Sequence, residues 1–219
     1  MNSQTKFDDP PRHKPYIWPS WFTKLLSGED HCWWRAWTKT NYKVTKLPET
    51  KDRKDFFREY TEKHDAITVR RAEELRQLGC TVYVEDEAQF KMVGSAADVA
   101  GKPDIAAVRD RTLLVVDAKS GKKRSSDHYQ VLIYMFALPL TWLRDKVDEV
   151  KGEVEYTDGP VPVRPLGPVE KDQILEAIKK LTGSEPDPIP SVWECKYCDV
   201  AKCPVRYKSN TEGNVSEYF

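Results

Sequence analysis

Apolar residues recur at three- and four-residue steps from about Asp52 to Leu78, which is the spacing of one face of a helix. This face carries Phe56, Tyr60, His64, Ile67, Arg71, Leu75 and Leu78. Gly79 follows directly, and glycine often caps a helix C-terminus because it adopts the left-handed conformation without strain. The pattern predicts one long amphipathic helix that ends near residue 78.

Short apolar runs follow this helix. We expect strands over residues 81–84, 88–93, 104–108 and 112–118. The polar segment Arg109-Asp110-Arg111 separates the last two runs and predicts a hairpin. The uninterrupted apolar run from Leu113 to Val116 is typical of a buried central strand.

Two further helices are expected in the second half of the chain. One spans about 127–138 and is interrupted at Pro139, and the other spans about 170–181. Helices that alternate with mixed strands predict an α/β fold in which helices flank a central mixed β-sheet.

The length of 219 residues suits one domain with a substantial core. We predict a flexible N-terminal lead over residues 1–16, a single domain over 17–208 and a flexible tail over 209–219. The domain includes a cysteine-rich segment at 193–204.

Composition excludes several protein classes. No apolar run approaches the roughly 20 residues of a membrane span, and the polar, proline-rich N-terminus does not resemble a secretory signal. We therefore expect a cytoplasmic protein that does not contact membranes.

Lysine plus arginine equal aspartate plus glutamate at 35 each, so nucleic acid would have to bind to a local basic surface and not to the bulk charge. Lys122, Lys123 and Arg124, just after Lys119, are the best candidates for part of such a DNA-binding surface. The alternative is an ordinary solvated basic loop.

A pair of carboxylates and a lysine carry the candidate chemistry. Asp117 and Lys119 point to the same side of their strand because side chains alternate between faces, and the hairpin brings Asp104 toward the same sheet edge. Two converging carboxylates suit Mg²⁺ or Mn²⁺. A divalent ion beside a lysine serves phosphodiester hydrolysis, because both stabilise negative charge and activate water. The alternative is a buried strand that ends in a solvated Asp and Lys.

Three other residues extend this set. His64 lies on the predicted long helix, where it is either a metal ligand or a core histidine. Gln130 and Tyr134 are four residues apart on one helix face, where they either contact DNA and water or simply pack.

In this order, His64, Gly101-Lys102-Pro103-Asp104, Asp117-Ala118-Lys119 and Gln130-x-x-x-Tyr134 resemble the motifs of the RecB-like branch of the PD-(D/E)XK nucleases. The resemblance runs from about Trp18 to Cys203 and implies a restriction-endonuclease-like core. It implies metal ligation by His64, Asp104, Asp117 and the Ala118 carbonyl, and catalysis by Asp104, Asp117, Lys119, Gln130 and Tyr134. The acidic position of the D/E-x-K motif is Asp here, where Glu is more common.

The five cysteines are more consistent with a metal site than with disulfides in a cytosolic protein. Cys195, Cys198 and Cys203 supply three thiolates, and either Cys32 or Cys80 supplies a fourth. One early cysteine plus a C-terminal triplet resembles the iron–sulfur nucleases of the CRISPR-associated spacer-acquisition type. That resemblance implies a 4Fe–4S cluster on Cys32, Cys195, Cys198 and Cys203, which would join the N- and C-terminal segments, and leaves Cys80 in the core. A structural Zn²⁺ suits four thiolates equally well on ligand chemistry.

The implied function is metal-dependent hydrolysis of DNA, by exonuclease action on single strands or overhangs. The chain carries no G-x-x-x-x-G-K-[ST] loop for ATP-driven unwinding, so the DNA must already be open. The alternative is a catalytically weak DNA-binding or scaffold subunit that has protein partners in a CRISPR-adaptation or recombination-repair complex.

Overall fold

The computed structural model describes residues 9–46, 51–189 and 191–207, with the backbone alone over 51–57. The helices are α1 (Thr23–Ser27), α2 (Trp33–Asn41), α3 (Lys51–Gln77), α4 (Ser125–Ala137), α5 (Pro168–Thr182) and α6 (Val192–Tyr197), with short 3-10 turns at Pro19–Trp21, Glu85–Glu87 and Leu138–Leu140. The strands are β1 (Tyr16–Ile17), β2 (Thr81–Val84), β3 (Phe90–Val93), β4 (Asp98–Gly101), β5 (Ile105–Arg109), β6 (Thr112–Lys119), β7 (Glu149–Tyr156) and β8 (Gly159–Val163).

The larger sheet has the order β2-β5-β6-β7-β8, so β6 lies at its centre as predicted. β6 and β7 are parallel, and the other neighbouring pairs are antiparallel. The predicted hairpin of β5 and β6 is confirmed. Asp110 and Arg111 both have positive φ, at 49° and 60°, which is the conformation of the two-residue turn that matches strand twist.

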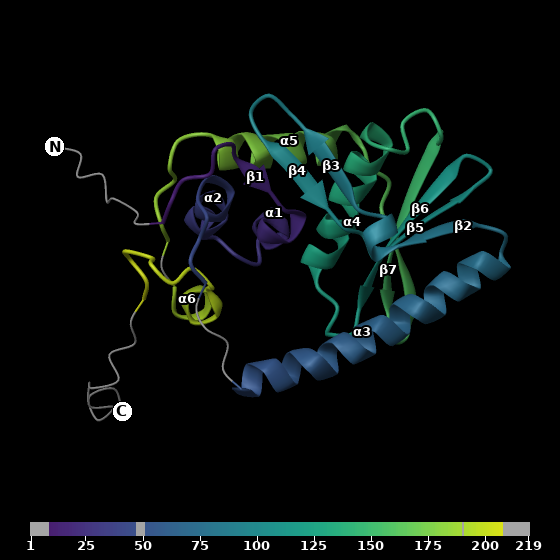
Figure 1. Ribbon diagram of the computed structural model, residues 1–219, viewed down its shortest axis with the longest axis horizontal. Coiled ribbons are helices and arrows are strands. Elements are labelled where there is room, and N and C mark those ends of the chain that lie inside the picture. Colours follow the sequence, from purple (N-terminus) through teal and green to yellow (C-terminus); the bar gives the residue numbers. More distant parts are fainter. Residues whose placement is uncertain (1–8, 47–50, 190, 208–219) are drawn as a thin grey trace.

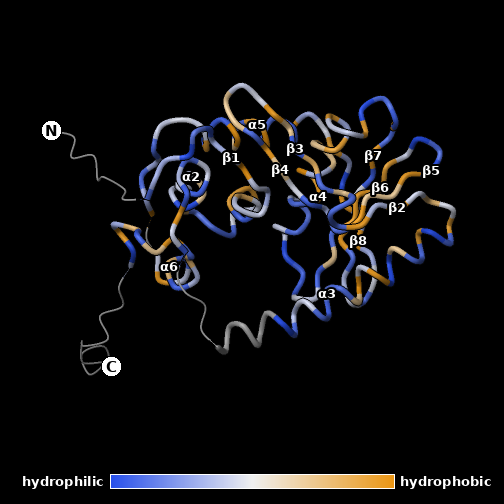
Figure 2. The backbone as a smooth tube through the Cα atoms, in the orientation of Figure 1, coloured by the Kyte–Doolittle hydropathy of each residue, from blue (hydrophilic) through white to orange (hydrophobic). Residues whose placement is uncertain are grey.

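Helices cover both faces of this sheet (Figure 1). α3 packs Ala72 and Leu75 on one face, against Ile105, Ala107 and Val116. The other face carries the main core, to which α4 and α5 contribute, including Leu132 and Ile174. The apolar colouring of Figure 2 is concentrated in the strands between these helices. The predicted α/β class with a mixed sheet flanked by helices is confirmed. Gly79 has φ +81° at the end of α3, as expected of a glycine cap.

A second, smaller sheet was not predicted. It has the order β1-β4-β3, with β1 parallel and β3 antiparallel to β4. The strand predicted at 88–93 begins at Phe90 and belongs to this sheet. β4 escaped prediction because its sequence, Asp-Val-Ala-Gly, has low strand propensity, and pairing on both edges supplies what local preference does not.

Residues 9–16 pack against the domain, which differs from the flexible lead predicted for residues 1–16. Asp9 is 3% exposed and accepts hydrogen bonds from Thr45 N at 2.8 Å and Thr45 Oγ1 at 2.6 Å. Pro11 forms an isolated bridge with Tyr42. The rest of the predicted lead, residues 1–8, and the predicted tail at 209–219 lie outside the described residues.

Candidate active site

The candidate catalytic residues meet where β5 begins and β6 ends. Ile105 pairs with Val116 in an antiparallel register, so Asp104, one residue before β5, lies opposite Asp117. Asp117 and Lys119 point to the same side of β6 and form an ion pair. α3 contributes His64 and α4 contributes Gln130, so three elements converge on this edge.

Asp104 is anchored by two contacts. Its Oδ2 lies 3.1 Å from His64 Nε2 and accepts a hydrogen bond of 2.6 Å from the Ala118 main-chain N–H. The hydrogen bond to Asp104 is the largest influence on His64 and raises the pKa of its imidazole, against the effect of burial. His64 is therefore in direct contact with the Asp104 carboxylate at this edge.

Asp117 is almost completely buried, with 1% of its surface exposed. Gln130 Nε2 donates to its Oδ1 at 2.9 Å, and the Lys119 ammonium faces its Oδ2. Burial raises the pKa of Asp117 to about 7, and the Asp104 charge adds to this shift while Lys119 opposes it. Burial depresses the pKa of Lys119, but the charges of Asp117 and Asp104 outweigh that effect and raise it overall. The lysine stays protonated.

Tyr134 lies in the main core, behind Asp117 and Gln130. It is 1% exposed, and its ring packs edge-to-face on Phe90. Its hydroxyl accepts from Gln130 Nε2 at 3.1 Å and donates to the Lys102 carbonyl at 3.3 Å. Tyr134 therefore reaches the site through Gln130.

The donors present at this edge suit a hard divalent cation, because they are two carboxylates and an imidazole. Asp117 Oδ2 is buried, and among the described residues the Lys119 ammonium is its only polar partner. Across the described part of the chain, however, no three His, Cys, Asp or Glu side chains are arranged so that they could hold one metal ion together. Asp104 and Asp117 are instead turned toward protein partners, which a metal ion would replace.

The catalytic edge opens into a cavity of about 680 Å³. Lys119, Lys122, Arg124 and Gln130 line it, together with the acidic residues Glu59 and Asp127. Lys123 is turned away and pairs with Asp158 at 2.8 Å. Lys123 lines a neighbouring hollow together with Arg124, so the three predicted basic residues are divided between two adjacent spaces.

Sequence reasoning missed the opposite walls of this cavity. α1 supplies Lys24, and α3 supplies Lys63 together with Tyr60, whose ring stacks on His64 at 6.4 Å between centroids. Lys63 follows from the helical period, since it lies three residues after Tyr60 on the same face of α3. Nothing local in the sequence marks Lys24, because only packing of α1 beside α4 brings it here.

Four cysteines gather around a second, small cavity. Cys32, Cys195, Cys198 and Cys203 all line it, together with Trp34 and Arg35. All are free thiols, and burial raises the pKa of both Cys198 and Cys203. Cys80 lies away from this cavity and packs against the small apolar core between α3 and the sheet, as predicted. As at the catalytic edge, the thiols are near one another but are not among any ready set of three metal ligands in the described residues.

Polar contacts hold the cysteine segment to the N-terminal helices. Glu194 Oε1 accepts from the main-chain N–H groups of His31 at 2.8 Å and Cys32 at 3.0 Å. Asp199 pairs with Lys39 at 2.9 Å and with Arg35 at 3.4 Å, and both of these basic residues lie on α2. These contacts join Cys32 to the C-terminal triplet without any bond between the sulfurs.

Residues 24–204 match the family described as the PD-(D/E)XK nuclease superfamily. The chain belongs to this superfamily. The matched range contains both the catalytic edge and the four gathered cysteines, and membership suggests metal-dependent nuclease activity. No significant match was found among curated proteins.

A solved structure titled "Crystal structure of SSO0001" is similar to this chain, with a TM-score of 0.50 and 15% identity over 90% of this chain and 89% of that one. At that identity the likeness concerns the fold alone. Among the described helices, none combines the length and apolar character needed to cross a membrane.

Proposed function

We propose that the protein is a metal-dependent deoxyribonuclease of the RecB-like branch that hydrolyses phosphodiester bonds. The observation that carries this proposal is the convergence of Asp104, Asp117 and Lys119 at one sheet edge, beneath a cavity lined by lysines and an arginine.

His64, Asp104 and Asp117 are the side chains that would hold Mg²⁺ or Mn²⁺, and Ala118 would contribute its carbonyl. The Ala118 N–H points to Asp104, and the N–H and C=O of one strand residue point to the same side. The Ala118 carbonyl is thus directed to the carboxylate side of β6. When bound, the metal supplies Lewis-acid polarisation of the phosphate and lowers the pKa of a coordinated water.

Lys119 has the position of the catalytic lysine. Its side chain is 19% exposed, so the ammonium reaches the cavity while Asp117 anchors it. A protonated lysine there orients the attacking water and stabilises the charge that develops on the phosphate. Gln130 fixes the Asp117 carboxylate, and Tyr134 fixes Gln130.

The proposed substrate is DNA, single-stranded or with overhangs, degraded as an exonuclease. Lys24, Lys122 and Arg124 around the cavity supply the positive charge that phosphates require, and Lys63 there is paired with Glu59 at 2.7 Å. Because the sequence has no ATP-driven unwinding motif, a partner in a DNA-processing complex of the CRISPR-adaptation or repair type would open the duplex. We place the protein in the cytoplasm, where thiols stay reduced.

We further propose that Cys32, Cys195, Cys198 and Cys203 hold a 4Fe–4S cluster, supported by the gathering of these thiols at one cavity. Cluster ligation deprotonates the thiols, whose pKa values burial now raises at Cys198 and Cys203. Anaerobic purification followed by iron, sulfide and zinc analysis tests this. Stoichiometric zinc in a colourless protein would replace the cluster with a structural zinc site.

The test of the nuclease is a cleavage time course on end-labelled single strands, overhangs, blunt duplexes and circular single strands, with Mg²⁺, Mn²⁺ or EDTA. We expect metal-dependent loss of linear single strands, stepwise products from one end and intact circles. Cutting of circles would make the enzyme an endonuclease. No cutting by folded, metal-supplied protein would favour the binding or scaffold alternative.

A further inference from the structure

The N-terminal half of α4 presents two functional faces. Asp127 and Gln130 line the catalytic cavity, whereas Ser125, His128 and Tyr129 line a separate hollow of about 570 Å³. These sets follow the helical three- and four-residue period on either side of one helix. Arg124, just before α4, lines both spaces. The hollow is thus about one helix diameter, roughly 10 Å, from the catalytic edge.

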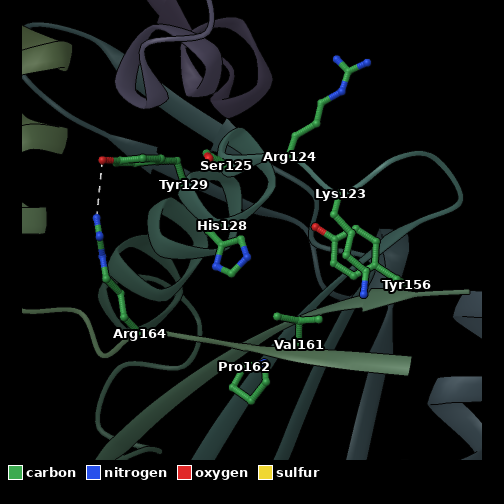
Figure 3. A pocket seen from close by; sticks show the side chains of 9 residues that line it. All are labelled: Lys123, Arg124, Ser125, His128, Tyr129, Tyr156, Val161, Pro162 and Arg164. Carbon is green, nitrogen blue, oxygen red and sulfur yellow. Dashed lines mark hydrogen bonds between the residues drawn. The ribbon is translucent and has the colours of Figure 1, made fainter. Parts of the chain in front are cut away.

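Aromatic, apolar and basic side chains line this hollow together (Figure 3). β8 supplies Val161, and Pro162 lies beside it; the His128 ring lies between α4 and this strand. Arg164 lies 5.5 Å from the centroid of the Tyr129 ring. Apolar walls do not contribute to binding of a phosphate alone, whereas they can pack against a nucleobase.

The polar groups of the hollow differ in whether they already have partners. Arg164 pairs with Glu170 at 3.1 Å, and Lys123 pairs with Asp158 at 2.8 Å and covers the ring of Tyr156. Among the described residues, the His128 imidazole and the Arg124 guanidinium have no hydrogen-bond or ion-pair partner. The hollow therefore offers an unpartnered heterocycle, which both donates and accepts, beside an unpartnered cation.

Resting on the proposed nuclease function, we propose that this hollow binds one unpaired nucleotide of the DNA strand that flanks the scissile phosphate. The base lies in the hollow against Tyr129 and the Arg164 guanidinium, and His128 hydrogen-bonds its edge. Arg124 contacts the phosphate between this nucleotide and the catalytic cavity. Single-strand sites combine basic tracks with aromatic faces in this way, and stacking tolerates any base.

This subsite would account for the proposed preference for open DNA. A base in the hollow must leave its duplex partner, because the walls of α4 and β8 flank it. A single strand or overhang has no pairing to lose, whereas a blunt duplex must first unpair. The hollow would select the substrate without contacting the reacting atoms.

The experiment is an abasic scan of binding without metal. Short fluorescent single strands, each with one base removed, are titrated with wild-type protein in EDTA and followed by anisotropy. We expect one position at which base removal weakens binding about 10-fold, the size of one lost stacking contact. In His128→Ala and Tyr129→Leu the loss of affinity caused by removing that base should shrink toward onefold.

Three variants serve as controls or keep the fold. Tyr129→Leu keeps apolar volume against the core, and Tyr129→Phe keeps both the ring and the penalty. His13→Ala, at an exposed histidine, is the matched histidine control. Thermal melts verify that each variant is folded.

A scan without any sensitive position, or a penalty unchanged in both hollow variants, overturns the subsite. Titration with deoxynucleoside monophosphates distinguishes strand from free nucleotide. Saturable mononucleotide binding that His128→Ala removes, without a base-dependent step in the oligonucleotide, would also overturn the assignment to the strand. Because the scan needs no catalysis, a sensitive position in a protein that cuts nothing refutes the nuclease alone. Normal cleavage with a flat scan refutes the subsite alone.

Discussion

The catalytic edge and the cysteine cavity are two candidate sites that the fold assembles differently. The proposed catalytic residues Asp104, Asp117 and Lys119 lie within 16 positions and are fixed by the register of one hairpin. The cysteine cavity joins Cys32 to a triplet beginning at Cys195, and side-chain contacts such as Lys39–Asp199 do the joining.

The difference concerns which protein contacts hold the residues of each site in place. Asp117 is buried between β5 and β7 with a core on both sheet faces, so the edge is formed by folding itself. The cysteine segment contains α6 of only six residues, with Trp193 69% and Tyr197 61% exposed. It buries little apolar surface, so ligand binding should contribute much of its stability.

The largest expected effect is at the catalytic edge itself. Lys119→Ala should lower the cleavage rate by about 10²–10⁴-fold, because it removes the cation that orients water and stabilises transition-state charge. Cleavage kinetics and DNA binding are measured together, with the exposed Lys151→Ala as control. Equal loss of binding and turnover would contradict a catalytic role.

The next effect tests the ion pairs that join α3 to β7 beside the catalytic edge. Arg71 pairs with Glu153 at 2.7 Å and Glu74 at 2.9 Å, and approaches the fully buried Glu155. Arg71→Ala should lower the free energy of unfolding by about 3 kcal/mol, because it leaves buried carboxylates short of a partner. Denaturant unfolding measures this. The exposed Arg76→Ala should cost less than about 0.5 kcal/mol, and equal effects would refute the network's role.

At the cysteine cavity the expected effect is local. Cys32→Ser should abolish the visible absorption of the proposed cluster and speed proteolysis of the C-terminal segment, while the sheet keeps its protection from hydrogen exchange. Cys80→Ser is the matched control, since Cys80 packs outside the cavity. Global unfolding of Cys32→Ser would show that the two regions form one cooperative unit.

The last prediction distinguishes protonation of Asp117 from metal binding by Asp117. Its pKa rises from 3.8 to about 7 on folding, so the unfolded chain releases this proton at lower pH. Its contribution to the stability of the metal-free protein is present below about pH 4 and is lost as pH rises through about 7. Denaturant unfolding across this range should show the decline, Asp117→Asn should lack it, and Mn²⁺ should restore more stability at pH 8 than at pH 5. A Mn²⁺ effect unchanged in Asp117→Asn would contradict metal ligation there.

Local sequence accounts for much of the catalytic edge. Asp117 and Lys119 share a face because a strand has a two-residue period, and Asp104 faces Asp117 because a two-residue turn sets the hairpin register. Gln130 and Tyr134 share a face because a helix brings residues four apart together. Those relations depend only on neighbours along the chain, so the sequence determined them.

Tertiary packing decided the rest. It turned Tyr134 into the core behind Gln130, directed Lys123 away from the catalytic cavity and brought Lys24 into it. It also paired β4 with β1 and β3, and placed His128 against β8. Each outcome depends on which distant element lies against a given face, and that is set by burial summed over the whole core, which no local period encodes.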